Sequence, residues 1–414
     1  MSGIEELINE LCPDGVEFRP LRDVGTWHGG GTPSKSNAEF WQDGTVPWLS
    51  PKDMVVETIR ATGLRVSVKA LEQSPLKLVP AGSVAFVVRS NVLRRRLPIA
   101  LVPFDVTLNQ DMRAVIPHED VLPEYLLQAC RSRAESILAV AGRTDGSMAA
   151  IKSSTLLDFR VPIPPIEIQR EVVGVLSRFS SLQAELELQL QAELERRRQQ
   201  YGHYRDAILS FSDGEKVRWA PLSDLGRFIR GKRFTKADFE DAGIPCIHYG
   251  EIYTHFGTSA TSVVSHLRRD NASGLRYAQP GDVVIVDVGE TVEDVGKAVA
   301  WLGDEPVAIH DHSYAFRHAL NPAFVSYIMQ TSWFRREKAK YIARTKVNTL
   351  LVAGFGKIEI PVPTMKEQER IVDILDKFDA VVNNLSVDLP IEIAARRQQY
   401  EHYRDKLLTF KEVA

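Results

Sequence analysis

The chain has 414 residues, of which 44% are hydrophobic and 25% charged; this composition is ordinary for a soluble globular protein, and the length predicts two or more domains. No apolar run reaches the ~18 residues needed to span a membrane, and the N-terminus carries acidic side chains where a signal peptide carries basic ones, so we expect a cytoplasmic protein. Three scattered cysteines without a CxxC pair argue against disulfides and zinc, and a net charge of −3 does not by itself indicate a nucleic-acid binder.

The first predicted element is a short helix over Ile4–Leu11. At a spacing of 199 residues this helix aligns with the last turns of a much longer helix, and Asp14 behind it aligns with Asp213. We therefore expect residues 1–15 to pack where a linker helix would enter the first domain, closing a pseudo-symmetric ring with the N- and C-termini close together. A frayed terminal helix is the alternative.

Two segments of mixed pattern follow, residues 16–161 and 213–360, each of ~145 residues, a normal domain size. Short apolar runs after Pro and Gly turn signals predict strands, and longer apolar-periodic stretches predict helices. The examples are strands at Val84–Val88 and Val283–Val286 and helices at Leu122–Val140 and Pro322–Ala343.

A long helix is predicted over Ile166–Phe211, within a spacer segment of residues 162–212. Its apolar residues recur at spacings of three and four with Glu, Gln and Arg between them. They are Val172, Val175, Phe179, Leu182, Leu186 and Leu190. Pro164-Pro165 predicts the start and Ser212-Asp213-Gly214 the stop. About 45 residues at 1.5 Å each span nearly 70 Å, so the apolar stripe must pack against another element.

The last segment, residues 361–414, repeats this helix as Met365–Phe410. Arg197–Phe211 reads RRQQYGHYRDAILSF and returns as Arg396–Phe410, RRQQYEHYRDKLLTF. Pro162, Gln169 and Leu176 return as Pro361, Gln368 and Leu375 at the same spacing of 199 residues. The sequence between these anchors barely repeats. The chain therefore predicts a pseudo-two-fold protein whose two long helices pair as an antiparallel coiled coil.

Pro390 is the one conspicuous difference between the helices, because it stands where the first helix has Gln191. Proline inside a helix costs about 3 kcal/mol and kinks or breaks it. Asp388-Leu-Pro390 alternatively restarts a helix, with proline in its first turn. We expect a bend there rather than a straight rod.

Short motifs appear in one order in each half. The first half carries Gly30-Gly-Thr-Pro-Ser34, Phe40-Trp41, Val46-Pro-Trp48-Leu-Ser, Asn109-Gln110, Val161-Pro-Ile-Pro-Pro165 and Gln169. The second half carries Phe228-Ile-Arg-Gly231-Lys, Ile244-Pro245, Ile360-Pro-Val-Pro363 and Glu367-Gln368, a looser match at its start. As an ordered set, over essentially the whole chain, they resemble the specificity (S) subunits of type I restriction-modification enzymes.

The resemblance implies an α+β fold with two mixed α/β target recognition domains, residues 16–161 and 213–360, separated by two long helices. It implies a non-catalytic subunit that binds double-stranded DNA with a bipartite target, one half-site to each domain. The helices would set the spacer and dock two methyltransferase subunits, which methylate adenine N6 with S-adenosylmethionine; motor and nuclease subunits join for restriction. The chain itself lacks an Asn-Pro-Pro-aromatic run, a GxxxxGK[ST] loop and a convincing nuclease cluster.

Polar and basic residues of the first domain are candidates for DNA contact. Three adjacent arginines after a predicted strand can neutralise phosphates, and Asn91 can pair with adenine; a solvated charged loop is the alternative. A turn followed by a capped helix is equally compatible with the segment around Asn37. The predicted DNA-binding residues are Lys35, Ser36, Asn37, Arg89, Asn91, Arg94, Arg95, Arg96, Asn109, Gln110, Arg143 and Thr144.

In the second domain, a basic cluster after Phe228 favours phosphate contact. His310-Asp-His312 lacks a third partner for a metal site and lies near the position of Asn109-Gln110, so we expect base readout, with core polar packing as the alternative. The predicted DNA-binding residues are Arg230, Lys232, Arg233, Lys236, His310, His312, Arg344, Lys346 and Asn348.

The repeated block is identical in halves that otherwise diverge, which favours contact with one partner met twice; simple capping of the helix pair is the alternative. The predicted partner-binding residues are Arg197, Gln200, Tyr201, Tyr204, Arg396, Gln399, Tyr400 and Tyr403. Two other functions stay open: a structural coiled-coil adaptor that binds proteins through two globular domains, and a self-contained nuclease or methyltransferase. No metal or cofactor is expected in this chain.

Overall fold

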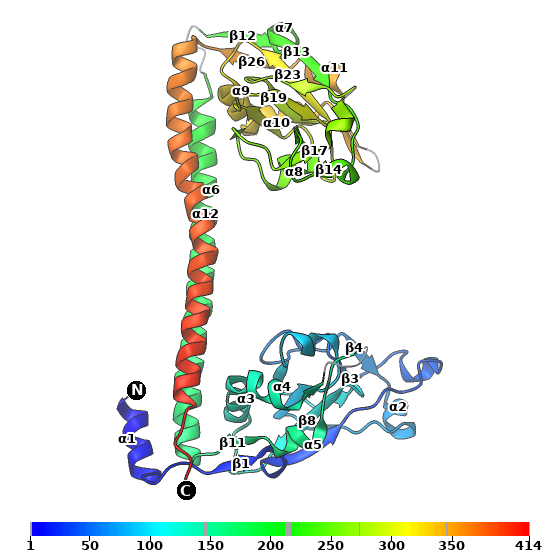
Figure 1. The fold of residues 1–414 in the computed structure, drawn as a ribbon, viewed down its shortest axis with the longest axis vertical. Coiled ribbons are helices and arrows are strands. Elements are labelled where there is room, and N and C mark those ends of the chain that lie inside the picture. The colour runs from blue at the N-terminus through cyan, green and yellow to red at the C-terminus, as the bar shows by residue number, and fades with distance from the viewer. Residues whose placement is uncertain (1, 144–147, 212–216, 273, 345–346, 414) are drawn as a thin grey trace. The chain divides into compact units, whose positions relative to one another are not determined.

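The computed structural model describes residues 2–143, 148–211, 217–272, 274–344 and 347–413, with the backbone alone at 2, 271 and 382–388. The chain divides into two compact units, Met1–Leu188 with Ile391–Ala414, and Gln189–Pro390. Each unit therefore holds one mixed domain and a stretch of both long helices (Figure 1). The fold is α+β, as predicted.

The first unit has a main four-stranded sheet that consists, in spatial order, of β2 (Gly25–Gly29), β8 (Met112–Pro117), β5 (Ser83–Val87) and β6 (Ile99–Val102). A smaller sheet consists of β4 (Leu64–Val66), β3 (Val46–Leu49) and β7 (Thr107–Leu108). Two-stranded pairs join β1 (Phe18–Pro20) to β11 (Arg160–Pro162) and β9 (Gly142–Arg143) to β10 (Ala150–Ile151). Its helices are α1 (Ser2–Leu11), α2 (Val68–Gln73), α3 (Pro123–Ser132), α4 (Ala134–Ala141), α5 (Ser153–Asp158) and the start of α6 (Ile166–Ile208).

The second unit has a main sheet of β13 (Gly226–Arg230), β23 (Ser313–His318), β19 (Val283–Val286), β21 (Ala298–Trp301) and β16 (Ser259–Ala260). A second sheet consists of β14 (Phe239–Glu240), β17 (Ser265–Leu267), β15 (Ile244–Ile247), β22 (Val307–Ile309) and β18 (Tyr277–Ala278). The smaller pairings are β12 (Arg218–Pro221) with β26 (Glu359–Val362), and β20 (Val288–Gly289), β25 (Asn348–Leu350) and β24 (Ile342–Ala343) in one sheet. Its helices are α7 (Leu222–Leu225), α8 (Tyr249–Thr254), α9 (Pro322–Gln330), α10 (Ser332–Ala339), α11 (Val352–Phe355) and the start of α12 (Met365–Leu407).

The two domains share one scaffold. β2, β8, β5 and β6 have the same order and antiparallel pairing as β13, β23, β19 and β21. The central strands β5 and β19 are buried along their whole length, which explains their continuous apolar sequence. Each main core also includes residues of the long helices: Val172 and Leu176 in the first unit, Ile371 and Leu375 in the second. Each domain is thereby packed onto the beginning of the helix that follows it.

The predicted helices Leu122–Val140 and Pro322–Ala343 were each too long. The first is divided at Arg133 into α3 and α4, and the second at Thr331 into α9 and α10. Thr331 has an extended backbone, and its hydroxyl accepts from the amide of Phe334, 3.3 Å away, so it caps a new helix. Ile342 and Ala343 pair with β25 as a strand. Apolar periodicity runs across these breaks and therefore did not indicate them.

A buried glutamine attaches each long helix to its domain. Gln169 accepts from the amide of Leu122 (2.9 Å) and donates to the carbonyl of Pro164 (2.8 Å). Gln368 accepts from the amide of Asn321 (2.8 Å) and donates to the carbonyl of Pro363 (2.9 Å). Both side chains are buried. The sequence repeat thus marks a repeated hydrogen-bond arrangement.

Replacing Gln169 or Gln368 with leucine is expected to destabilise the corresponding unit by about 2–4 kcal/mol, because buried backbone groups lose their partners. Thermal unfolding measures the loss, and faster hydrogen exchange at the amide of Leu122 or Asn321 locates it. The exposed Gln199, whose side chain donates to Glu195 on its own helix, provides the control Gln199→Ala, which should change little. Equal effects of all three substitutions would contradict the anchoring role.

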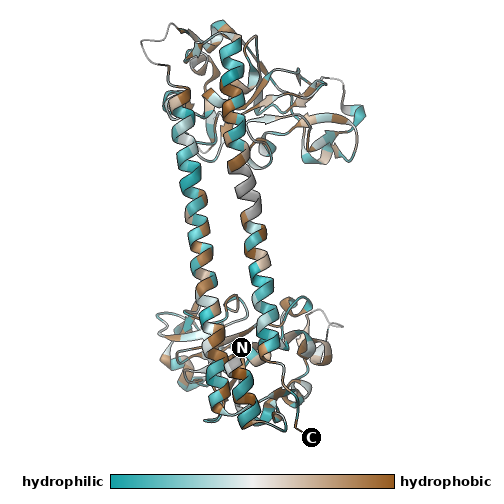
Figure 2. Ribbon diagram, turned by 90° about the vertical axis from the view of Figure 1, so that its left-hand side faces the viewer, coloured by the Kyte–Doolittle hydropathy of each residue, from teal (hydrophilic) through white to brown (hydrophobic). Residues whose placement is uncertain are grey.

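The extents of the two long helices agree with the prediction to within three residues at each end. Helices α6 and α12 have 43 residues each, and Figure 2 shows apolar residues recurring along both. In the first unit Ser180 and Glu187 of α6 contact Tyr400 and Arg397 of α12, an antiparallel arrangement. The apolar stripe is not buried throughout: Val172 is buried, whereas Phe179 and Leu182 are exposed. Helix α12 is continuous through Pro390, so the chain does not restart there.

The N-terminal segment lies beside the C-terminal one, as predicted. Ile4 of α1 is buried in the core of the first unit. The amide of Val16 donates to the carbonyl of Lys411 (2.8 Å), and the amide of Val413 donates back to Val16 (3.0 Å). This bridge, and the burial of Ile4, argue against a frayed terminal helix.

Candidate DNA-recognition site

In both domains a glycine lies directly against the backbone of the turn that precedes a strand of the main sheet, β8 in the first domain and β23 in the second. We call this close contact the glycine crossing. The amide of Gly30 donates to Met112 (3.2 Å) and that of Gly31 to Leu108 (2.8 Å). In the second domain the amide of Gly231 donates to Ser313 (2.9 Å) and that of Lys232 to Ile309 (3.0 Å). A Cβ on Gly30 would lie 1.9 Å from the carbonyl oxygen of Asn109, and one on Gly231 would lie 2.0 Å from that of His310. Only glycine fits this crossing, which holds the turn before β8 and before β23 in place.

In the first domain this turn meets the end of β5. Arg89 Nε donates to Asp111 Oδ1 at 2.5 Å, and Gln110 Nε2 lies 3.3 Å from Asp111 Oδ2. Ala150 of β10 forms a bridge with Arg89 and pairs with Arg143 of β9. The structure therefore brings Arg89, Gln110 and Arg143 together. Asn109 is buried, and its Oδ1 accepts from the amide of Asp111 (2.7 Å), which is a role in the turn itself.

The corresponding turn of the second domain meets the end of β19. His312 Nδ1 lies 3.4 Å from Asp287 Oδ1, and Arg230 Nη2 lies 3.5 Å from Asp287 Oδ2. Asn348 of β25 donates to the carbonyl of Glu290 (2.9 Å). Burial raises the pKa of Asp287, although His312 and Arg230 both act to lower it. The structure thus brings Arg230 and His312 together around a buried carboxylate that the sequence did not single out, while Asn348 lies on the neighbouring strand pair.

His310 occupies a different environment from His312. It is only 6% exposed and packs against Phe234, His248 and Tyr249 with ring centroids 4.8–5.0 Å apart. Burial lowers the pKa of His310, and it lowers that of His248 to about 4, so both imidazoles are neutral at physiological pH. Core packing, the alternative considered for this motif, fits His310 better than base contact.

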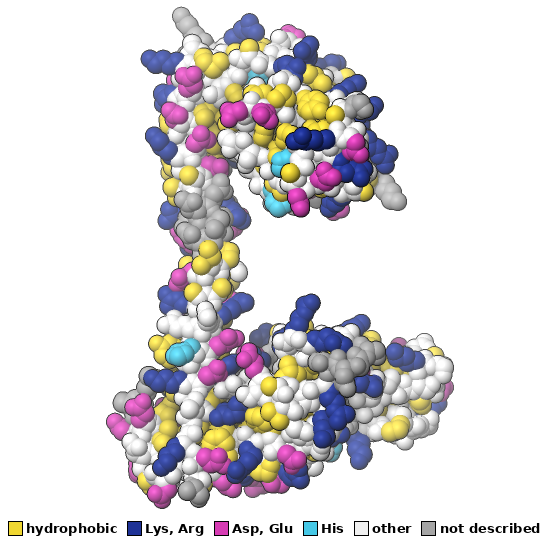
Figure 3. Space-filling model, viewed as in Figure 1, with side chains coloured by type: hydrophobic (Ala, Val, Ile, Leu, Met, Phe, Trp, Pro, Cys, Tyr) yellow, Lys and Arg dark blue, Asp and Glu magenta, His cyan; other side chains and the backbone are white. Residues whose placement is uncertain are grey.

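The remaining predicted DNA-binding residues lie on loops and short 3-10 helices. Asn91 and Arg94 bound a short 3-10 helix, and Arg96 Nη2 lies 3.4 Å from the carbonyl of Met54. Asn37 caps another such helix through the amide of Glu39 (3.1 Å). Figure 3 shows Lys and Arg side chains spread over the visible face of the first domain. Among the predicted DNA-binding residues that the structure describes, the exposed cations are Lys35, Arg89, Arg94, Arg95, Arg96, Arg143, Arg230, Lys232, Arg233, Lys236 and Arg344. Thr144 and Lys346 lie outside the described residues.

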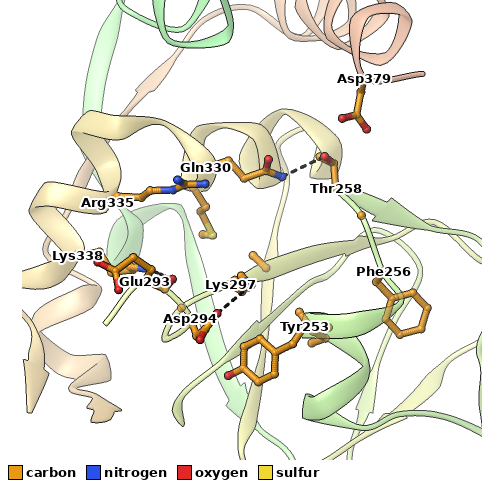
Figure 4. A pocket seen from close by; sticks show the side chains of 15 residues that line it. Tyr253, Phe256, Thr258, Glu293, Asp294, Lys297, Gln330, Arg335, Lys338 and Asp379 are labelled. Atoms are coloured by element: carbon orange, nitrogen blue, oxygen red, sulfur yellow. Dashed lines mark hydrogen bonds and ion pairs between the residues drawn. The ribbon is translucent and has the colours of Figure 1, made fainter. Parts of the chain in front are cut away.

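A hollow of about 320 Å³ in the second unit contains a buried lysine (Figure 4). Lys338 is 3% exposed, and its amine donates to the carbonyls of Glu293 (3.1 Å) and Val295. The residue therefore clamps the loop before β21. Burial lowers the pKa of Lys338 to about 8, with nearby Arg335 acting in the same direction.

The stability of the second unit is expected to increase with pH because of Lys338. Since its folded-state pKa lies below its unfolded value, the unfolded chain binds more protons above pH 8, and the unfolding free energy rises by about 1–2 kcal/mol up to pH 9.5. Chemical denaturation across this range measures the slope. Lys338→Met should flatten the slope, whereas substitution of the exposed Lys357 should leave it unchanged. A slope unaffected by Lys338→Met would contradict the assignment.

The predicted partner-binding residues form two similar surfaces on the long helices. In the first unit Tyr403 stacks on Phe179 with centroids 6.2 Å apart, and in the second Tyr204 stacks on Phe378 at 6.0 Å. Tyr201 and Tyr400 are partly buried against the cores of their units. This burial favours the alternative in which these two tyrosines cap the helix pair instead of contacting a partner. The exposed residues of the repeated block include Arg197, Gln200, Arg396 and Gln399. Arg197 and Arg396 pair with Glu193 and Glu392 on their own helices, at 2.7 and 2.8 Å.

Two α+β domains share one scaffold and carry different polar loops at equivalent positions, which defines a class of tandem proteins whose halves share a frame and display different side chains. The family description "Type I restriction modification DNA specificity domain" matches residues 13–196 and 215–395. The chain belongs to this family of type I restriction-modification specificity subunits and contains its domain twice.

Individual relatives agree with this assignment. The chain is 44% identical over 202 residues to the EcoR124I/EcoR124II specificity subunit of Escherichia coli, a match that covers 49% of this chain and spans only half of that relative. It is 26% identical over 400 residues to the EcoprrI specificity subunit of Escherichia coli, with 91% of each chain covered. A chain from a solved type I restriction-modification system shares the fold, with a TM-score of 0.70 at 18% identity over 96% of this chain and 98% of the other.

Two other features of the described residues bear on function. None of the helices in the described ranges is long and apolar enough to cross a membrane. Within the same ranges, no group of His, Cys, Asp and Glu is placed to bind a metal ion.

Proposed function

We propose that the chain is the DNA sequence-recognition subunit of a type I restriction-modification complex, itself without catalytic activity. Each domain reads one half of a bipartite double-stranded DNA target through the loops at the end of its main sheet. The observation that carries the proposal is the repeated frame with unlike loops. The Gly30 and Gly231 crossings and the Gln169 and Gln368 anchors repeat, whereas the side chains displayed beside them differ. Two domains that share one scaffold but display different side chains would recognise two different half-sites.

The long helices would pair as an antiparallel coiled coil with pseudo-two-fold symmetry and fix the spacer between half-sites. Contacts between α6 and α12 support this proposal. Phe179 and Glu187 meet Tyr403 and Arg397 in the first unit, and Tyr204 meets Phe378 in the second, each pair in an antiparallel sense. Dimeric DNA readers use fixed separations in the same way.

The two aromatic surfaces, Phe179 with Tyr403 and Phe378 with Tyr204, would each dock one methyltransferase subunit. They consist of the same residue types in each half, as one partner met twice requires. In the first unit they border a groove of about 390 Å³ that also contains Arg396 and Gln399. The partner would supply S-adenosylmethionine and the adenine methylation, and motor and nuclease subunits would join that complex.

Paired alanine substitutions should remove the methyltransferase subunits one at a time. Phe179→Ala with Tyr403→Ala, or Phe378→Ala with Tyr204→Ala, is expected to weaken one docking event ten-fold or more, because exposed aromatic residues are frequent interface anchors. Native mass spectrometry then finds one methyltransferase subunit in place of two, and none with all four substitutions. Leu188→Ala, at another exposed apolar position, is the control. Retention of two subunits by the fourfold variant excludes this surface.

The function itself is tested by mapping N6-methyladenine in cells that express the chain with its methyltransferase partner. The expected result is one bipartite motif with two short half-sites and an unread spacer. Purified complex should bind a duplex with that motif, and binding should fall steeply with salt. Protein binding without sequence-specific DNA binding would instead identify a coiled-coil adaptor. Saturable binding of S-adenosylmethionine to the isolated chain would contradict a non-catalytic role.

A further inference from the structure

The end of the main sheet is the same backbone site in both domains. The amide of Val88 donates to the carbonyl of Asp111 (2.8 Å), and the amide of Asp287 donates to that of His312 (3.1 Å). The amide of Ile151 then donates to Val88 and that of Leu350 to Asp287, both at 2.7 Å. Both amides belong to the strands just after the main helices, 199 residues apart in the sequence. In each domain, a backbone hydrogen bond therefore holds the residue at the end of the strand next to a residue of the glycine-held turn.

Each copy of this site carries one carboxylate and one polar side chain that points outward. In the first domain the turn supplies the carboxylate, Asp111, and Arg89, the residue directly after Val88 at the strand end, supplies the polar side chain, which is 52% exposed. Among the described residues, the guanidinium is bonded to Asp111 through Nε, which leaves the N–H groups on both terminal nitrogens free to donate within that set. A guanidinium fixed by a carboxylate presents these donors as a planar fork, the shape that matches O6 and N7 of guanine.

The second domain reverses the arrangement. The strand end supplies the carboxylate, Asp287, at 3% exposure, and the turn supplies His312, at 41%. Asp287 Oδ1 and His312 Nδ1 are both buried, have no hydrogen-bond partner among the described residues, and lie 3.4 Å apart. Arg230 beside Oδ2 favours the ionised carboxylate. A proton on Nδ1 would satisfy both buried atoms and leave Nε2 as an acceptor toward solvent.

We infer that Asp111 and Asp287 are positioning residues that orient Arg89 and His312 as the base readers of the two half-sites; this inference rests on the proposed function. Arg89 reads the acceptor edge of guanine. His312, through Nε2, reads a base with an amino group in the major groove, adenine N6 or cytosine N4. The same backbone site thus reads different bases because the carboxylate stands at the strand end in one domain and in the turn in the other.

A purely structural role explains these pairs less well. An ion pair as exposed as Arg89 with Asp111 adds little to stability, commonly below ~1 kcal/mol. The facing atoms of Asp287 and His312 are 3.4 Å apart, so the contact has room to shorten on ligand binding, as polar contacts at binding sites often do. His312 lies on the turn that the glycine crossing holds in place, and Arg89 pairs with Asp111 on the corresponding turn of the first domain.

The test uses the full chain with its methyltransferase partner. The motif of the unsubstituted complex is mapped first, and duplexes with each base pair of that motif replaced in turn are then used as binding probes. Asp287→Asn offers a donor to Nδ1, moves the imidazole proton to Nε2, and should shift the preference at one position of the second half-site from adenine or cytosine to thymine or guanine, by about ten-fold. Arg89→Lys should reduce the preference for guanine at one position of the first half-site by a similar factor.

Combined variants separate positioning from structural damage. His312→Ala should abolish the preference at the position that Asp287→Asn alters, and Asp287→Asn should add nothing in that background. Asp111→Asn should affect the position read by Arg89 and leave the second half-site unchanged. The inference is overturned if the single variants bind specifically yet keep every base preference, or if Asp287→Asn and His312→Ala act at different positions. A wild-type complex without any motif would instead refute the proposed function.

Discussion

Gly30→Ala is expected to destabilise the first unit by about 3 kcal/mol or more and to remove recognition of the first half-site alone. The added Cβ would lie 1.9 Å from the carbonyl oxygen of Asn109 and 2.6 Å from that of Leu108. Both neighbours are backbone atoms, so no side-chain rotation relieves the contact and the turn itself must move. That turn carries Asp111, and with it the orientation of Arg89.

The second domain provides the reciprocal experiment. In Gly231→Ala the Cβ would lie 2.0 Å from the carbonyl oxygen of His310, so the turn with His312 is displaced and the second half-site is lost. Thermal unfolding and the mapped methylation motif measure the two consequences separately. Each substitution is expected to remove recognition of one half-site only, because each unit has its own hydrophobic core.

The neighbouring glycine makes a matched control. A Cβ on Gly29 meets nothing within 4 Å, so Gly29→Ala should leave stability and motif intact although it is the adjacent residue. Gly257→Ala has the same role in the second domain. If Gly30→Ala and Gly29→Ala both leave stability and motif nearly unchanged, the turn can accommodate a Cβ at Gly30 and the steric argument is wrong.

The long-range organisation was readable from sequence because it repeats. The 199-residue spacing predicted the second long helix, and the paired Gln169 and Gln368 have equivalent hydrogen bonds. The alignment of Asp14 with Asp213 predicted that the two terminal segments lie close together, and Val16 forms a bridge with Glu412. A sequence repeat indicates tertiary structure because the same residues in the same surroundings form the same contacts.

The candidate site was only partly predictable, because its geometry depends on residues brought together from distant segments. Arg89 and Asp111 are 22 residues apart, and Asp287 precedes His312 by 25. Neither carboxylate was selected, since a lone Asp at a strand end has no local signature. His310 and His312 look equivalent in sequence, yet alternation around the turn buries one and exposes the other. Alignment of the halves at the 199-residue spacing places Asp111 opposite His310 rather than His312, so the sequence alone does not pair these side chains.

Lengthening both long helices at their matched positions is expected to lengthen the unread spacer and to leave both half-sites unchanged. The boundary between the compact units falls at Leu188 in α6 and at Pro390 in α12. Four residues inserted at each place add about 6 Å of helix, which corresponds to at most about two base-pair steps of 3.4 Å. Insertion into both helices keeps their facing residues in register, whereas insertion into one alone does not.

The measurement is the methylation motif of each variant. Because the readers lie on the domains and the insertions lie between them, the half-site sequences should persist while only the number of unread positions grows. Replacement of four residues by four others at the same places controls for local disruption. A changed half-site with an unchanged spacer would show that the helices do not set the separation. If the single-helix insertion lengthens the spacer as much as the double one, then one helix alone, and not the pair, carries the separation.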